Sequence, residues 1–230
     1  MVRPSVPPAE ALILDETVNQ ICGPGALFAG SRRQAVATGT RQVAMGATVS
    51  TDGVTSNIIA QLALNAQGVR PEWIASLSER GVGPLDLVEL LGVVARTMAI
   101  DTFCFALGVD AWPLPDPPSG AHVEAGPHGE VDASAACNGG WLPTVGPAWP
   151  TNALSAVPSE NRAMHQLQAA FYLATGEMGE LDVQRGLHRT QMELVAARTS
   201  LLNECFFCLR AITTHSLQEA YFSIGLSNTL

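Results

Sequence analysis

The sequence predicts an all-α protein. Hydrophobic residues recur at helical spacing in several segments, and no stretch shows the alternation of polar and apolar residues that is typical of a β-strand. Of the 230 residues, 47% are hydrophobic and 14% are charged, which is the composition of a folded chain with a sizeable core. Glycine or proline bounds most of the helical segments. Periodicity, composition and helix-boundary residues therefore all indicate the same fold class.

Three helices are predicted in the first half of the chain. Residues 55–67 begin with polar residues suited to an N-cap and carry an apolar face. Residues 71–80 begin with a proline, which is common at the first helical position, and end before a glycine. Residues 84–107 form one long apolar helix, and charged side chains interrupt its apolar run. We therefore expect a buried core helix there rather than a membrane span.

Three more helices are predicted in the second half. Residues 159–175 begin with a serine and end before a glycine. Residues 189–202 and 204–223 have the strongest helical patterns in the chain. Together with the first three, these segments account for the all-α prediction.

An irregular segment separates the two halves. Residues 110–158 hold nine of the fifteen prolines, so neither a helix nor a central strand is expected there. Because the segment also carries Trp112, Trp141 and Trp149, we expect it to pack against the helices, or to cover a ligand. The predicted organisation is an N-terminal helical repeat over 1–109, this irregular linker, and a C-terminal repeat over 159–230.

The two halves resemble each other at a spacing of 104 residues. The matched pairs are Glu89 with Glu193, Leu90 with Leu194, Phe103 with Phe207, and Cys104 with Cys208. Asp101 stands where the second half has Cys205. This pattern predicts a duplicated helical unit whose first copy has lost one thiol.

Charge excludes several classes of function. The net charge is −9, and all twelve basic residues are arginine. Without lysine, Schiff-base chemistry and the lysine-bearing phosphate loop are excluded. Nucleic acid and an anionic membrane are not expected as partners, because both need a clustered positive field. The N-terminal residues lack the apolar run of a signal peptide, and five cysteines fit a disulfide framework poorly, so we expect a cytoplasmic protein.

The strongest chemical signal is the pair Cys205 and Cys208. A C-x-x-C pair in the first turn of a helix places both sulfurs on one face, within reach of a disulfide. Asn203 is a candidate N-cap, and the positive end of the helix dipole would then lower the cysteine pKa and favour a nucleophilic thiolate. The alternative is a pair of buried apolar cysteines among Leu and Phe.

Glu193 is the candidate carboxylate, twelve residues before Cys205 in an otherwise apolar stretch. A desolvated carboxylate has a raised pKa suited to proton transfer. The alternative is a carboxylate at the rim that pairs with Arg189 or Arg198.

A glutamate that lies twelve residues before a C-x-x-C pair at the start of a helix resembles the alkyl hydroperoxidase D family of the carboxymuconolactone decarboxylase superfamily. The resemblance covers roughly 55–228 and is carried by the run QMELVAARTSLLNECFFCLRA. It implies a homo-oligomeric, all-α, duplicated fold and a peroxidase with no organic cofactor. Cys208 would attack a hydroperoxide, Cys205 would resolve the sulfenic acid as a disulfide, and Glu193 would relay protons. A dithiol donor protein would restore the thiols.

The sequence departs from this family at one position. The family pattern has a histidine four residues after the second cysteine, where this chain has Ile212. His215 lies seven residues beyond Cys208, about 10 Å along a helix, which is too far for a direct hydrogen bond. A bridging water, or a histidine from elsewhere such as His165, would be needed in its place.

Two further functions stay open. One is an acid–base enzyme like the lactone decarboxylases of the superfamily, which needs no cysteine pair. The other is a non-catalytic member that has lost the relay histidine. A metal site formed by Cys205, Cys208 and His215 lacks an evident fourth ligand, so no metal is predicted. His188 is expected to cap a helix, and Arg32 and Arg33 to lie on a solvated face.

Overall fold

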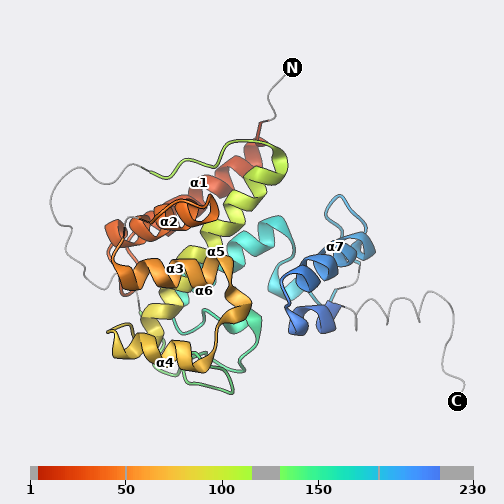
Figure 1. Ribbon diagram of the computed structural model, residues 1–230. Helices are drawn as coiled ribbons and strands as arrows, with labels where there is room; N and C mark the ends of the chain where they lie inside the picture. The colour runs from red at the N-terminus through yellow and green to blue at the C-terminus, as the bar shows by residue number, and fades with distance from the viewer. Residues whose placement is uncertain (1–4, 50, 116–129, 181, 213–230) are drawn as a thin grey trace, which may run out of the picture. The chain divides into compact units, whose positions relative to one another are not determined.

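The computed structural model describes residues 5–49, 51–115, 130–180 and 182–212 (Figure 1). In those ranges the chain forms helices and no β-strand, and one isolated antiparallel bridge joins Ala136 to Thr144. The predicted all-α fold class is therefore confirmed. The chain divides into two compact units, Met1–Ala170 (unit 1) and Phe171–Leu230 (unit 2).

Unit 1 is built around the long helix α5, which packs against α1, α2 and α3. Figure 1 shows α5 among these shorter helices. The α-helices that begin in unit 1 are α1 (Pro8–Cys22), α2 (Gly30–Ala44), α3 (Gly53–Leu64), α4 (Pro71–Glu79), α5 (Pro84–Leu107) and α6 (Pro158–Phe171). The predicted segments 55–67, 71–80, 84–107 and 159–175 thus correspond to α3, α4, α5 and α6.

The ends of α5 follow from residues at its two termini. Pro84 occupies the first helical position, and Asp86 Oδ2 accepts the backbone N–H of Gly83 at 2.8 Å. Gly108 ends the helix in the left-handed conformation with φ 69°, which glycine adopts without a steric cost. The sequence places both ends of α5 correctly for these reasons.

By length and composition alone, α5 is apolar enough to cross a membrane. In this structure, however, its charged residues bond neighbouring helices. Glu89 pairs with Arg33 of α2, Arg96 pairs with Glu160 of α6, and Asp101 pairs with Arg41 of α2. These contacts are those of a core helix, as the interrupted apolar run predicts.

The sequence analysis predicts no helix over α1 or α2. Pro8 occupies the first position of α1, and Gly39 lies in the interior of α2. A side chain at position 39 would meet Val49 at 2.8 Å and Ile59 of α3 at 2.9 Å, so glycine allows α2 and α3 to pack closely. Buried polar residues within α2 also interrupt its apolar pattern.

The irregular segment is described over 110–115 and 130–157. Leu154 and Val157 pack in a core cluster with Ala26 and Val88. Trp112 donates its indole N–H to Asp15 of α1 at 2.9 Å. Trp141 and Trp149 remain 52% and 55% exposed, so the expected docking of all three tryptophans fails for these two.

Unit 2 carries a short 3₁₀ helix, η3 (Thr175–Glu177), and the helix α7 (Arg189–Leu202). A second helical stretch covers 206–212 at the end of the described chain. The start of α6, expected in the C-terminal repeat, belongs to unit 1. The predicted helix 189–202 matches α7, whereas much of 204–223 lies outside the described residues.

Candidate functional site

The chain turns sharply between α7 and the helix that carries the cysteines. The backbone N–H of Cys205 donates to Ser200 O at 2.9 Å, and that of Glu204 donates to Leu201 O at 3.2 Å. These two bonds form a Schellman motif, which requires a left-handed residue at Glu204. Glu204 has φ 54°, and it is the only non-glycine residue with positive φ in the described part of the chain. The turn places Cys205 just before the next helix and Cys208 in its first turn.

Asn203 does not take its predicted role as an N-cap. It ends α7 instead, and its side-chain amide donates to Thr199 O at 2.9 Å. Thr199 O also accepts the backbone N–H of Asn203 at 3.0 Å, so the side-chain bond adds to the last helical hydrogen bond of α7. The residue that precedes the cysteine-bearing helix is Cys205 itself.

The two thiols of the C-x-x-C pair are in direct contact. Their Sγ atoms lie 2.6 Å apart, and both cysteines are free and half-buried. A disulfide needs about 2.05 Å between sulfurs, so a small movement would close the bond. The prediction that helical spacing brings these sulfurs within reach of each other is confirmed.

The expected lowering of the thiol pKa by the helix dipole is wrong for Cys208. Burial is the largest influence and raises its pKa, and the neighbouring Cys205 adds to the effect through its hydrogen bond and charge. Together they raise the pKa of Cys208 to about 12. Desolvation of the thiolate, with a second sulfur beside it, outweighs the partial charge of the helix terminus.

Glu193 lies on α7 and is 4% exposed. Its Oε1 accepts Arg189 Nε at 2.6 Å and the hydroxyl of Tyr172 at 2.9 Å. The predicted pairing with Arg189 is therefore present, but the pair is buried rather than at a rim. Among the described residues, Glu193 makes no hydrogen bond to a thiol, and its Oε2 accepts none.

Arg189 is held in place by the loop before α7. It donates to three backbone carbonyls of this loop, those of Glu177, Met178 and Glu180, at distances between 2.7 and 3.4 Å. Arg189 bonds these loop carbonyls and Glu193 at the same time, so it fixes the position of the Glu193 carboxylate. Glu193 Oε1 is thus anchored, whereas no described residue donates to its Oε2.

Tyr172 is a candidate functional residue that the sequence analysis missed. Burial raises its pKa, and so do its hydrogen bond to Glu193 and the charges of Glu193 and Cys208. The influence of Cys208 places the phenol within electrostatic range of the thiols. The only signal in the sequence is a hydroxyl-bearing aromatic residue in the apolar run AAFYLA, and such a buried hydroxyl usually has a hydrogen-bond partner.

The histidines take other positions. His188 caps α7, as predicted, and its Nδ1 accepts the backbone N–H of Thr190 at 3.3 Å. His165 contacts Thr151 O within unit 1. His215 lies outside the described residues. No group of three or more His, Cys, Asp or Glu side chains is arranged to hold a metal ion in the part of the chain that the structure covers.

The residues of the first half that match the dithiol site lie in the core of unit 1. Glu89 is fully buried, and both of its oxygens are occupied by Leu27 N and Arg33 Nη1. Asp101, which stands in place of a thiol, pairs with Arg41. Burial raises the pKa of the Cys104 thiol.

Arg33 does not lie on a solvated face as expected. It is 1% exposed and pairs with both Glu89 and Glu160. The neighbouring Arg32 is exposed and covers the ring of Phe28 at 4.2 Å. The expectation is therefore wrong for Arg33, because two buried carboxylates compensate its charge.

No protein-family model matches the chain, and searches of curated proteins and of solved structures give no similar protein. The geometry therefore defines an all-α protein with a close dithiol and with a half-buried tyrosine, bonded to a buried glutamate–arginine pair, within electrostatic range of it. The functional argument rests on that geometry.

Proposed function

We propose that this protein is a thiol–disulfide redox enzyme that reduces hydroperoxides through Cys205 and Cys208. The observation that carries the proposal is the 2.6 Å separation of the two sulfurs at the start of a helix. Vicinal thiols in this position are typical of reversible dithiol–disulfide centres. The resemblance of the glutamate and C-x-x-C spacing to the alkyl hydroperoxidase D family supports a hydroperoxide as the oxidant.

The proposed reaction transfers two electrons from the dithiol to the peroxide. Because the pKa of Cys208 is raised to about 12, its thiol first gives its proton to the carboxylate of Glu193 in the proposed proton pathway. The resulting thiolate attacks the terminal peroxide oxygen, the O–O bond breaks, and the alkoxide takes up that proton to leave as an alcohol. Cys205 then attacks the sulfenic sulfur of Cys208, the S–O bond breaks, and hydroxide leaves with a proton as water. An external dithiol protein returns two electrons and two protons by thiol–disulfide exchange.

Tyr172 and Glu193 supply the proton pathway in this proposal, in place of the histidine that Ile212 replaces. Because its pKa is raised, Tyr172 is protonated at neutral pH and is available as a donor. Glu193 is held through Oε1 by Arg189 and Tyr172, and its Oε2 is open to exchange. The loop before α7 holds Arg189, and Arg189 together with Tyr172 bonds Glu193 Oε1, so the position of Glu193 is fixed.

The proposal also covers the compartment in which the protein acts, its electron donor and its oligomeric state. A dithiol that cycles needs a reducing compartment such as the cytoplasm and a protein donor of electrons.

A homo-oligomer is proposed as well, because four apolar side chains of α7 are between 51% and 72% exposed, those of Leu194, Val195, Leu201 and Leu202. Light scattering of the purified chain would measure its mass, and a monomer at all concentrations would contradict this part.

Thiol trapping tests the reaction. The protein is treated with one equivalent of an organic hydroperoxide, its remaining thiols are alkylated, and the peptides are identified by mass. The expected result is rapid formation of a Cys205–Cys208 disulfide with release of the alcohol. Cys208→Ser should abolish turnover, whereas Cys137→Ser, which changes an exposed cysteine, should not. Free thiols and persistent hydroperoxide would refute the proposal.

Tyr172→Phe tests the proton pathway, because it removes one hydroxyl and keeps the ring. A general acid contributes about 100-fold or more to rate, so we expect a loss of this order in the rate of thiol oxidation. The solvent deuterium isotope effect on thiol oxidation separates this role from a structural one. If Tyr172 donates the proton, the variant changes this isotope effect, while a variant that only packs less well keeps it.

A further inference from the structure

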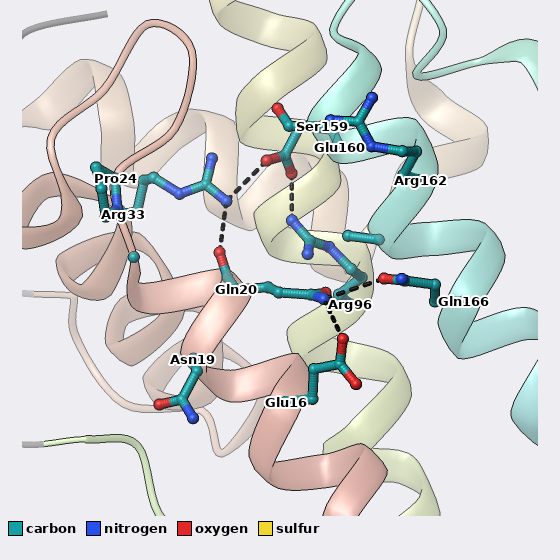
Figure 2. A pocket seen from close by; sticks show the side chains of 12 residues that line it. Glu16, Asn19, Gln20, Pro24, Arg33, Arg96, Ser159, Glu160, Arg162 and Gln166 are labelled. Carbon is teal, nitrogen blue, oxygen red and sulfur yellow. Dashed lines mark hydrogen bonds and ion pairs between the residues drawn. The ribbon is translucent and has the colours of Figure 1, made fainter. Parts of the chain in front are cut away.

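A polar cavity of about 780 Å³ lies within unit 1. Figure 2 shows side chains from α1, α2, α5 and α6 around it. Its volume is in the range of small-molecule sites, which is roughly 300–1,000 Å³. This cavity is separate from the dithiol site, since all of its lining residues precede residue 170.

Buried charges form one wall of the cavity. Arg33 and Arg96 direct their guanidinium groups at the carboxylate of Glu160 (Figure 2), and the three side chains are at most 3% exposed. Arg33 Nη2 lies 2.8 Å from Glu160 Oε1, and Arg96 Nη2 bonds Oε2. Among the described arginines, Glu89 pairs with Arg33 and not with Arg96, so Glu160, which Arg96 shares with Arg33, is the direct acidic partner of Arg96.

Two buried polar atoms of the lining have no hydrogen-bond partner in the described structure. These are Arg96 Nη1 and Ser159 Oγ. An unsatisfied buried group costs about 1–3 kcal/mol, and more when it is charged, so both atoms indicate an oxygen acceptor that is still to be bound.

The uncommitted groups around the cavity are mainly donors. Arg162 lines it from α6, is exposed, and forms no ion pair with any described residue. The acceptors are largely occupied, since Glu160 bonds two arginines and Glu16 accepts the side-chain amide of Gln20 at 3.0 Å. Uncommitted donors therefore outnumber uncommitted acceptors, and the guanidinium groups of Arg96 and Arg162 are among the donors. Such a lining suits a ligand rich in negatively charged oxygen.

Space around the ion pairs is preserved by a glycine. A Cβ at Gly92 of α5 would overlap the carboxylate of Glu160. Glycine inside a helix costs about 0.5–1 kcal/mol relative to alanine, so its presence at the centre of α5 is explained by the room that Glu160 and Arg96 need. The arrangement is thus built into the packing of α5 against α6.

We propose that this cavity binds a small organic carboxylate. The carboxylate of the ligand pairs with the exposed Arg162 at the mouth and, once the side chains that close off Arg96 Nη1 and Ser159 Oγ from solvent move aside, accepts hydrogen bonds from these two groups. The proposal does not depend on the dithiol chemistry, so either can fail without the other.

Titration calorimetry of the full chain with succinate tests the proposal, with succinamide as the neutral isostere and inorganic phosphate as the competing anion. The expected result is saturable binding of succinate and none of succinamide. Binding of both compounds, or of neither, would overturn the proposal. Stronger binding of phosphate than of succinate would overturn the carboxylate assignment.

Two variants that leave the buried ion pairs intact identify the residues. Ser159→Ala and Arg162→Gln should each weaken succinate binding about tenfold, in line with the loss of one hydrogen bond to a charged group. Arg80→Gln is the matched control, because Arg80 is an exposed arginine of unit 1 that does not line the cavity. Unchanged affinity in both variants would refute this site. Arg96 is left intact, since its loss would expose Glu160 as an unpaired buried charge.

Discussion

Replacing Glu160 by glutamine tests whether the buried charges of unit 1 hold its helices together. Glutamine is close in shape to glutamate, so the change removes charge without leaving a cavity. Removal of one partner from a buried ion pair costs about 3–5 kcal/mol, because the other charge stays buried. Arg33 keeps Glu89, whereas Arg96 loses its direct acidic partner. We therefore expect a loss of about 3 kcal/mol in the free energy of unfolding.

Two other ion pairs give a scale for this loss. Asp101 and Arg41 are 20% and 15% exposed, and Glu177 and Arg185 are 34% and 42% exposed. Solvent screens a pair more strongly as it becomes exposed, so exposed pairs contribute at most about 1 kcal/mol. Asp101→Asn should cost about 1 kcal/mol, whereas Glu177→Gln should leave the free energy of unfolding almost unchanged because solvent screens this pair.

The assay is urea unfolding followed by tryptophan fluorescence. All four tryptophans, at positions 73, 112, 141 and 149, lie in unit 1, so the signal reports that unit alone. Glu177→Gln changes unit 2 and is the control that should leave the transition in place. A cost below about 1 kcal/mol for Glu160→Gln, or one equal to that of Asp101→Asn, would refute the reasoning and show that water reaches the buried charges.

Three more predictions concern single positions. Gly92→Ala should destabilise unit 1 by about 2 kcal/mol in the same assay, because the new methyl overlaps Glu160, and a gain in stability would contradict this packing. Glu204→Gly should stabilise unit 2 by about 1 kcal/mol in thermal melts followed by circular dichroism, since it relieves the left-handed strain, and a loss would assign the side chain another role. Cys205→Ser should lower the pKa of Cys208 and speed its alkylation at pH 8, as followed by peptide mass, because two of the influences that raise this pKa disappear. In the unchanged chain the protonated thiol favours the folded state, so its contribution to stability is complete below the ordinary thiol pKa of 9.0 and is lost as the pH rises towards about 12. A slower alkylation in the variant would contradict the prediction.

Helices are predictable from this sequence where the buried face is apolar. The ends of α5 follow from a proline and a glycine, and α7 follows from its periodic pattern. In contrast, α2 buries Arg33, Gln34 and Thr40 together with its apolar residues. Polar residues enter that core because partners elsewhere in the chain bond them, as Glu89 bonds Arg33. Such long-range compensation leaves no local signal, which is why α2 was missed.

The candidate site shows the same limit. Helical spacing is a local property, so the contact between Cys205 and Cys208 could be predicted from four residues of sequence. The pKa of Cys208 depends on how deeply the thiol is buried, and burial is decided by packing beyond the motif. Tyr172 was missed for the same reason, because it lies 21 residues from Glu193 along the chain and meets it only in the folded unit.

Glu89 and Glu193, which match at a spacing of 104 residues, differ in how much of each carboxylate is left for chemistry. Both are buried and both bond an arginine. Glu89 has one oxygen on Arg33 and the other on a backbone N–H, so both oxygens make packing contacts. Glu193 accepts Tyr172 and Arg189 on Oε1, and no described residue donates to its Oε2. This difference supports the proposal that Glu193, rather than Glu89, relays protons.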